Sequence, residues 1–483
     1  MSKRRKIKIG TIFNGCELLE LLGKGGNGEV WKVVNHEQEA FYAIKFLINI
    51  DVVNYKRFQN EVSILSKLKI DGVMHVIDSY LPDDPKSEFP WFMMPVAQDF
   101  SKYCENLTPI EVASEFIKLA ITLKELHSQK IAHRDIKPAN MLIYNNRPYF
   151  TDFGLVQYPG KEDITPERRD IGAKYTMAPE MRRQADRSDG LPADVYSLAK
   201  SLWILITDQH KGFDGQYNPN SVIGISQYCP DIYTTELDNL LIECTDNDPK
   251  RRPSILSFLN RLSKWISLNK DFEQRNLLEW LELQNRIFPL GTPKSITWTD
   301  KNAIISILNQ IAFTKSLNHM FYPNGGGNTI NRITTPSEPS MIALHSGSGT
   351  RADIMKPKKL TFESFGFDPQ WNYFRLELEK IKPINIDNSI HSEGICQSLC
   401  EIEDGEYVDY SCWTYNDYEG QELPETARPV ERFLSGSFVF FGTSSIYNSI
   451  SATYDARHNM MTEEEFCRYI GEAAKRFFNK SND

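Results

Sequence analysis

The sequence is poor in cysteine and has no long apolar run. Its 483 residues include eight cysteines scattered along the chain, which indicates reduced thiols rather than a disulfide framework. Cys396, Cys400 and Cys412, with His391 nearby, match no common zinc-ligand spacing. No apolar stretch approaches the roughly 18 residues of a membrane span, and the basic N-terminus lacks the apolar region of a secretory signal. We therefore expect no membrane span and a cytoplasmic location.

The chain also lacks an excess of positive charge. It has 55 Lys and Arg against 64 Asp and Glu, a net charge of −9. Residues 1–270 are balanced, with 35 basic and 35 acidic side chains, whereas residues 391–435 contain eleven acids and two arginines. An acidic chain is a poor candidate for direct nucleic-acid binding, which depends on basic contacts to phosphates.

Hydrophobic periodicity predicts a small β-rich region followed by a larger helical one. In the first hundred residues we expect strands at 30–34 and 40–46 and a helix at 54–68. Helical spacing then predominates from residue 108, with further helices expected at 193–206, 235–245 and 255–266.

A glycine-rich stretch lies at the start of the β-rich region. Gly23, Gly25 and Gly28, followed by Val30, form the pattern GxGxxGxV. Glycine lets the backbone turn tightly and brings N–H groups close to phosphate oxygens. A strand is predicted after the pattern, whereas a dinucleotide-binding fingerprint would be followed by a helix.

Two charged residues follow the glycines at regular distances. Lys45 comes seventeen residues after Gly28 on an apolar strand, and Glu61 comes sixteen residues later on the predicted helix. A buried lysine needs a carboxylate partner to stay charged. We therefore predict a Lys45–Glu61 pair that holds nucleotide phosphates.

The most specific motif is HRDxKPxN, which residues 133–140 match at every defined position, with Asp152-Phe153-Gly154 twelve residues further on. Three more motifs follow in order: MAPE at 177–180, DVYSL at 194–198 and DPKRRP at 248–253. With these motifs the chain resembles the eukaryotic-type (Hanks-type) serine/threonine protein kinases over about 12–266. The resemblance implies an α+β, bilobal protein kinase fold with a β-rich N-lobe and a helical C-lobe.

The resemblance implies a kinase domain at 12–268, with an N-lobe at about 12–97 and a C-lobe at about 98–268. Beyond it we expect a helical connector at 269–322, a Gly- and Ser-rich linker or long loop at 323–358, and an α+β accessory domain at 359–483. Helices are predicted at 273–287, 300–315 and 462–478, and strands at 373–380, 407–415 and 436–442.

The resemblance also implies ATP and Mg²⁺ as cofactors and protein substrates as partners. Phosphoryl transfer asks the protein mainly for positioning and charge neutralisation. The three glycines would cover the phosphates, and Lys45, held by Glu61, would contact them. Val30, Ala43 and Met94 would contact the adenine, with Pro95 and Ala97 offering hinge backbone.

The HRDxKPxN residues would carry the chemistry. By the resemblance, Asp135 orients a substrate hydroxyl and accepts its proton, and Lys137, typical of the Ser/Thr-specific loop, neutralises the transferred group. Asn140 and Asp152 would bind Mg²⁺, which prefers oxygen ligands. Glu180 and Arg252 correspond to a buried ion pair of the helical lobe.

Regulation is predicted at Arg134 and Thr165. An arginine before the catalytic aspartate accompanies control by a phosphate on the activation segment in this family, and a phosphate on Thr165 could pair with Arg134. One departure is Ala173, which replaces a threonine that normally bonds the catalytic Asp and Lys. We expect this change to loosen the arrangement of Asp135 and Lys137.

These motifs predict an active, autophosphorylating serine/threonine protein kinase in signalling, and analogy with soluble bacterial kinases suggests a stress or anti-phage response. The alternatives are a pseudokinase or regulatory binding module acting through the C-terminal domain, and a small-molecule phosphotransferase, although the latter usually lacks the activation segment. In residues 391–435, aromatic residues interleave with the acids. This pattern predicts either a half-exposed strand or a surface for a basic partner or for the kinase domain itself.

Overall fold

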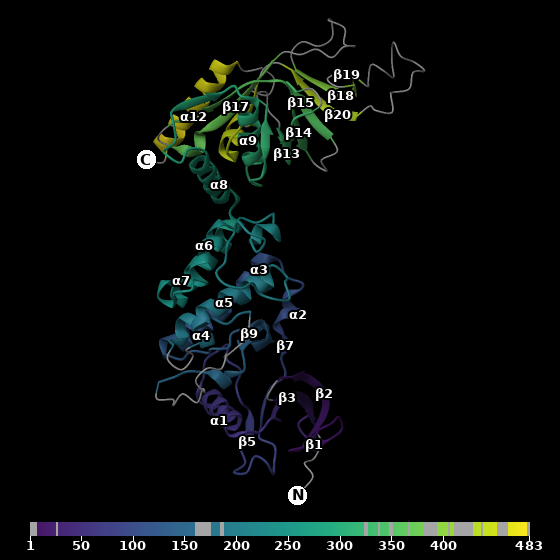
Figure 1. The fold of residues 1–483 in the computed structure, drawn as a ribbon, viewed down its shortest axis with the longest axis vertical. Helices are drawn as coiled ribbons and strands as arrows, with labels where there is room; N and C mark the ends of the chain where they lie inside the picture. Colours follow the sequence, from purple (N-terminus) through teal and green to yellow (C-terminus); the bar gives the residue numbers. More distant parts are fainter. Residues whose placement is uncertain are drawn as a thin grey trace, which may run out of the picture. The chain divides into compact units, whose positions relative to one another are not determined.

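The computed structural model describes residues 7–25, 28–159, 175–183, 188–322, 327–336, 339–346, 351–365, 368–379, 394–403, 406–409, 428–435, 438–451 and 462–480. The chain divides into two compact units, Met1–Lys270 and Asp271–Asp483 (Figure 1). Among the described helices, none is long and apolar enough to cross a bilayer.

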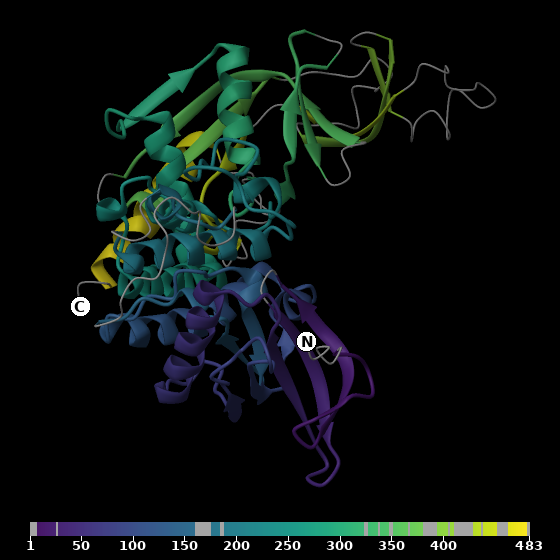
Figure 2. The same ribbon diagram turned by 60° about the horizontal axis from the view of Figure 1, so that its bottom comes forward.

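The first unit begins with a six-stranded antiparallel sheet, drawn in purple and blue in Figure 2. In spatial order its strands are β1 (Ile12–Phe13), β2 (Cys16–Lys24), β3 (Gly28–Asn35), β4 (Ala40–Leu47), β6 (Trp91–Pro95) and β5 (Asp78–Tyr80). Helix α1 (Val52–Lys67) follows β4 and begins where the Asp51 side chain accepts a hydrogen bond from the Asn54 N–H at 2.8 Å. The strands predicted at 30–34 and 40–46 and the helix at 54–68 are confirmed.

The rest of the first unit is mainly helical. It contains α2 (Phe100–Cys104), α3 (Pro109–Ser128), α4 (Pro179–Arg183), α5 (Gly190–Ile206), α6 (Thr235–Cys244) and α7 (Ile255–Lys270), with a small sheet of β7 (Gln98–Asp99), β8 (Met141–Tyr144) and β9 (Arg147–Phe150). A capping box of Thr108 and Glu111 starts α3. Helix α5 is buried on nearly all sides, which makes it the central helix of this region. The predicted helices are confirmed.

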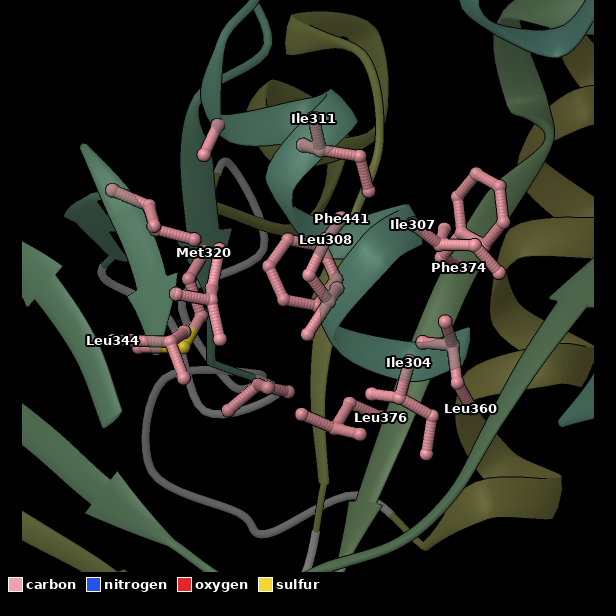
Figure 3. Packing of buried hydrophobic residues seen from close by; sticks show 14 of the residues in the cluster. Ile304, Ile307, Leu308, Ile311, Met320, Leu344, Leu360, Phe374, Leu376 and Phe441 are labelled. Carbon is pink, nitrogen blue, oxygen red and sulfur yellow. The ribbon is translucent and has the colours of Figure 1, made fainter. Parts of the chain in front are cut away.

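The second unit is built around another six-stranded sheet. In spatial order its strands are β10 (Ser295–Trp298), β16 (Pro357–Glu363), β17 (Tyr373–Leu378), β21 (Phe438–Phe441), β11 (His319–Phe321) and β12 (Gly327–Thr329). Alternate residues of its strands bury on opposite faces, as period two requires. On one face Phe374, Leu376 and Phe441 pack against α8 (Phe272–Ile287) and α9 (Lys301–Ala312), as Figure 3 shows for α9.

The opposite face of this sheet packs against the C-terminal helices. Tyr373, Phe438 and Phe440 join a second apolar cluster with α11 (Ser444–Ser451) and α12 (Glu463–Lys480). Thr462 and Glu465 form the predicted capping box at the start of α12. The helices predicted at 273–287, 300–315 and 462–478 are confirmed, as are the strands at 373–380 and 436–442 over the residues described.

The second unit contains another six-stranded sheet. Its spatial order is β13 (Arg332–Thr334), β14 (Ile342–Ser346), β15 (Arg351–Met355), β20 (Arg428–Ser435), β18 (Gly394–Glu403) and β19 (Glu406–Asp409). Strands β18, β19 and β20 come from the acidic segment 391–435, whose remaining residues lie outside the described ranges. The strand predicted at 407–415 is described only as far as Asp409.

Two segment predictions beyond residue 270 are wrong. The expected linker or long loop at 323–358 contains β12, β13, β14 and β15. These strands are only three to five residues long, and apolar residues such as Ile333 and Leu344 are obscured by neighbouring Gly, Ser and Thr. The expected helical connector at 269–322 also contributes β10 and β11, whose partners β16 and β21 are distant in sequence. The accessory unit therefore begins at Asp271 rather than at residue 359.

Candidate active site

Lys45, on β4, lies within reach of two carboxylates. Its Nζ is 2.7 Å from Oε1 of Glu61 on α1 and 3.2 Å from Oδ1 of Asp152. The Glu61 side chain is 3% exposed, whereas that of Asp152 is 43% exposed. The predicted pair of Lys45 with Glu61 is thus formed, and Asp152 joins it on the side open to solvent.

The three charged side chains shift one another's pKa values. Burial disfavours the charged form of Lys45, but the carboxylates of Asp152 and Glu61 outweigh it and raise the pKa of Lys45 above its ordinary value. Lys45 in turn lowers the pKa of Asp152. Burial raises the pKa of Glu61, since Lys45 offsets only part of the desolvation. The site therefore holds a fixed cation beside an ionised and accessible carboxylate.

Asp135 is held by two other polar residues of its loop, Lys137 and Asn140. The Nζ of Lys137 lies 2.7 Å from Oδ2 of Asp135. Asn140 Nδ2 donates to the same Oδ2 at 2.9 Å and to the Asp135 carbonyl at 2.8 Å. The other oxygen, Oδ1, is buried and has no hydrogen-bond partner among the described residues. Burial raises the pKa of Asp135, against the effect of Lys137. This geometry suits a general base, because Oδ1 can accept a hydrogen bond from a substrate hydroxyl.

The backbone of this loop is held by Asp194 on α5, which the sequence analysis did not name as a site residue. The buried Asp194 carboxylate accepts hydrogen bonds from the N–H groups of His133 and Arg134, each at 2.7 Å, and lies 3.1 Å from Nε2 of His127. Arg134 has φ of +67°, a conformation that non-glycine residues rarely adopt. The signal in the sequence was a carboxylate near the start of a mostly apolar helix.

The predicted glycines differ in what surrounds them. A Cβ at Gly28 would lie 2.4 Å from the carbonyl oxygen of Phe46 on β4, whereas one at Gly23 would meet no atom within 4 Å. The Gly25 N–H donates to the Gly28 carbonyl at 2.9 Å and closes the turn between β2 and β3. Packing of β3 on β4 therefore requires glycine at 28, while Gly23 and Gly25 are exposed and open to a ligand.

The residues predicted to contact adenine lie on adjacent strands. Ala43 on β4 pairs in register with Met94 on β6, and both are buried. Pro95 ends β6, and Ala97 follows it in a half-buried connection before β7. Val30, on β3, is also half-buried. These residues thus lie together on β3, β4 and β6 and in the connection that follows β6.

The oxygen donors of Asn140 and Asp152 suit Mg²⁺. Asp152 is ionised and partly exposed, and Asn140 uses Nδ2 toward Asp135, which leaves its Oδ1 as an acceptor. Among the described residues no group of three His, Cys, Asp or Glu side chains could hold a metal ion by itself. Mg²⁺ sites in phosphoryl-transfer enzymes typically use one or two carboxylates together with waters and phosphate oxygens, which fits this donor set.

Glu180 and Arg252 form the predicted pair of the helical lobe. Two hydrogen bonds, at 2.6 and 2.9 Å, join the Arg252 guanidinium to the Glu180 carboxylate. The Arg252 Nε donates to the Asp246 carbonyl at 2.8 Å, and the guanidinium stands 4.8 Å from the ring centre of Tyr196. The pair ties α4 to α5 and to the turn before α7.

The predicted regulatory position Thr165 and the departure at Ala173 lie outside the described residues. The loosening expected from Ala173 stays a prediction. The Lys137–Asp135 ion pair itself is formed, at 2.7 Å. Arg134 is 7% exposed. The predicted surface for a basic partner falls in the acidic segment 391–435, of which residues 391–393, 404–405 and 410–427 lie outside the described ranges.

Comparison with known proteins identifies relatives of the first unit. The sequence profile of the protein kinase domain matches residues 16–266. The serine/threonine-protein kinase KIC1 of Saccharomyces cerevisiae is 28% identical over 283 residues, which cover 55% of this chain and 24% of KIC1. The serine/threonine-protein kinase PknH of Mycobacterium bovis is 28% identical over 214 residues, which cover 43% of this chain and 35% of PknH. The chain thus spans about a quarter to a third of the length of these relatives.

Among solved structures, the Mycobacterium tuberculosis PknI kinase domain matches with 23% identity and a TM-score of 0.41, over 54% of this chain and all of that domain. The profile and the curated relatives confirm the predicted resemblance to serine/threonine protein kinases and, for the first unit, the bilobal α+β fold.

Proposed function

The chain belongs to the protein kinase family, and we propose that it transfers the γ-phosphate of ATP to serine or threonine hydroxyls of protein substrates. The observation that carries the proposal is the arrangement at Asp135, which presents a buried free Oδ1 while Oδ2 is held at 2.7 Å by Lys137. Transfer of a phosphoryl group to a hydroxyl requires a carboxylate that orients the hydroxyl and a cation that neutralises the transferred group, and Asp135 and Lys137 would supply these.

The chain's own residues divide the work. Lys45, kept charged by Glu61 and Asp152, neutralises nucleotide phosphates, and the exposed backbone at Gly23 and Gly25 approaches them. Asp135 orients the substrate hydroxyl through Oδ1 and takes up its proton. Lys137, beside Asp135, stabilises the negative charge of the transferred phosphoryl group.

Asn140 and Asp152 would hold Mg²⁺, which supplies neutralisation of the phosphate oxygens. The oxygen donors of both side chains suit this ion. Ala43, Met94 and the backbone of Pro95 and Ala97 would hold the adenine, with Pro95 offering only its carbonyl.

The test is incubation of the purified chain with γ-labelled ATP and Mg²⁺, using the wild type and Asp135→Asn. We expect label on protein in the wild type and a loss of about a hundredfold or more in the variant, because a general base contributes about 10²–10⁴-fold. Asp83→Asn, at an exposed position of the same unit, is the matched control and should keep full activity.

The alternatives give different results in the same experiment. Label on a small soluble product would indicate a small-molecule phosphotransferase. Absence of label with retained ATP binding would indicate a pseudokinase or binding module acting through the second unit. Either result would overturn the proposal.

Control and context belong to the same proposal. Phosphate on Thr165 would pair with Arg134 and order the activation segment, and autophosphorylation would supply it. A basic partner at 391–435, a cytoplasmic location and a role in stress or anti-phage signalling are further proposals. The free thiols of Cys16, Cys104, Cys229, Cys244 and Cys467 are compatible with the cytoplasmic location.

A further inference from the structure

Lys200, in the middle of α5, is a buried lysine that the mechanism does not use. It is 1% exposed, and its Nζ donates to the carbonyl oxygens of Phe213 at 2.6 Å and Gly215 at 2.8 Å. The ammonium group also stands 3.6 Å from the ring centre of Phe213 and 5.2 Å from that of Tyr196. Among the described residues its hydrogen bonds go to carbonyl oxygens and not to a carboxylate, and Asp214 acts on it only electrostatically.

A buried cation without a carboxylate partner is costly, so its contacts must matter to be retained. The two carbonyls and the ring that Lys200 Nζ contacts beyond α5 belong to one loop, Lys211–Gly215. Charge-assisted hydrogen bonds are about twice as strong as neutral ones. Lys200 thus fastens this loop to the central helix, and the Tyr196 hydroxyl adds a bond to the Gly215 carbonyl at 3.2 Å.

The far side of the same loop contacts Tyr175. A Cβ at Gly212 would lie 2.8 Å from the Tyr175 carbonyl oxygen, and Lys211 Nζ stands 5.9 Å from the Tyr175 ring centre. Asp214 reaches Arg182 at 4.0 Å. The loop is therefore packed between α5 and the segment Tyr175–Arg182.

The segment Tyr175–Arg182 and the catalytic loop are both held by α5. Met177 and Ala178 pack on Tyr196 of α5 and on Leu155, three residues after Asp152. The same helix holds the Asp135 loop through Asp194. Because α5 holds both the segment and the Asp135 loop, we expect a protein substrate whose hydroxyl reaches Asp135 to contact this segment as well.

We propose that Lys200 is a positioning residue for the protein substrate, which acts by fixing the loop Lys211–Gly215 against Tyr175. The inference rests on the proposed kinase activity and adds a determinant of substrate binding to it. Because Lys200 touches neither nucleotide nor reacting atoms, its effect falls on the KM for protein and not on the KM for ATP.

The protonation of Lys200 offers a second readout. Burial lowers the pKa of Lys200 to about 7, with Asp214 opposing and Arg182 reinforcing the effect. The other titratable or charged groups at this junction include Tyr196 and Arg252, which stand 4.8 Å apart, Glu180, which pairs with Arg252, and Lys211 with Tyr175. Above neutral pH the amine loses its attraction to the Phe213 ring and its charge-assisted bonds, so substrate binding weakens as pH rises from 6.5 to 8.

The experiment measures steady-state kinetics of the full chain with a protein or peptide substrate that the wild type phosphorylates. Lys200→Met should raise the KM for that substrate about tenfold, leave kcat and the KM for ATP within twofold, and flatten the pH dependence of the substrate KM. Lys200→Gln keeps a hydrogen-bond donor without the charge, so its substrate KM should lie between those of the wild type and Lys200→Met. Lys250→Met, at an exposed position of the same unit, is the matched control.

Gly212→Ala perturbs the same junction while leaving Lys200 in place. Gly212→Ala should raise the substrate KM in the same way. If Lys200→Met does not fold, Gly212→Ala and Lys200→Gln provide the test instead. An unchanged substrate KM in folded Lys200→Met, or in both Lys200→Gln and Gly212→Ala, would overturn the inference. A wild type that labels no protein at all would instead contradict the proposed kinase activity.

Discussion

The ammonium group of Lys45 lies 2.7 Å from the carboxylate of Glu61, which is 3% exposed. The contact joins β4 to α1, two elements separated by a turn, and sets the position of the helix against the sheet. Because Glu61 is buried, the pair is kept charged only as long as both partners are present.

Removing Lys45 should abolish most activity. Lys45→Met leaves Glu61 and Asp152 without their cation, and we expect kcat/KM for ATP to fall about a hundredfold or more. Glu61→Gln should cost less, about tenfold, because Asp152 still holds the lysine. Label transfer and equilibrium ATP binding provide the measurement. Lys67→Met, at an exposed position near the end of α1, should behave as the wild type.

The glycines separate a folding role from a ligand role. Gly28→Ala places a methyl group 2.4 Å from the Phe46 carbonyl and should lower the free energy of unfolding by about 1–3 kcal/mol. Gly25→Ala meets no such neighbour and should leave stability unchanged while weakening ATP binding. Urea unfolding and ATP titration of both variants decide this, and equal stability of the two would contradict it.

Breaking the Glu180–Arg252 pair should destabilise the first unit. Arg252→Leu leaves the Glu180 carboxylate partly buried without its partner, a change that typically costs about 3–5 kcal/mol. The neighbouring Arg251 is 74% exposed, so Arg251→Leu is a close control and should cost little. Urea unfolding measures both, and the transition that ATP shifts identifies the kinase unit. Similar midpoints for the two variants would refute the prediction.

The stability of the first unit should respond to pH through Lys200. Its pKa falls from 10.5 in the unfolded chain to about 7 in the folded one, so between these values the unfolded state binds more protons. Stability therefore rises with pH in this window, by at most about 1.4 kcal/mol per pH unit. Unfolding curves at pH 7, 8 and 9 should show this rise in the wild type relative to Lys200→Met, and parallel curves for the two proteins would count against it.

Thr165 provides a test of regulation. Thr165→Ala should lower activity about tenfold or more if phosphate there pairs with Arg134, whereas Thr165→Glu should restore only part of it because one carboxylate carries less charge than a phosphate. Intact-mass analysis of the wild type should show added phosphate. Unchanged kinetics together with an unphosphorylated Thr165 would dismiss this residue as the control site.

The first unit could be predicted in detail because its signals are local. Asp135, Lys137 and Asn140 lie within six residues of one another, and the hydrophobic period of the strands and helices is regular. What escaped prediction there was the role of contacts across distance, such as Asp194 holding His133 and Arg134, and Lys200 holding a loop more than ten residues away.

The second unit shows the limit of local reading. Helices α8, α9 and α12 carry their own apolar face and caps, and they were predicted. Strands β12 to β15 are short, and their Gly- and Ser-rich surroundings suggested a linker. β13, β14 and β15 pair with one another in sequence order, and β15 joins them to β20, which lies far along the chain.

By itself the sequence determined the family, the order of the motifs and the chemistry-bearing residues, because those depend on residue type and spacing. Tertiary structure alone decided which carboxylates share Lys45, which oxygen of Asp135 stays free, that Gly28 serves the sheet, and that residues 271–483 form one unit. Each of these depends on groups brought together from distant positions, where burial and hydrogen-bond geometry set the energies.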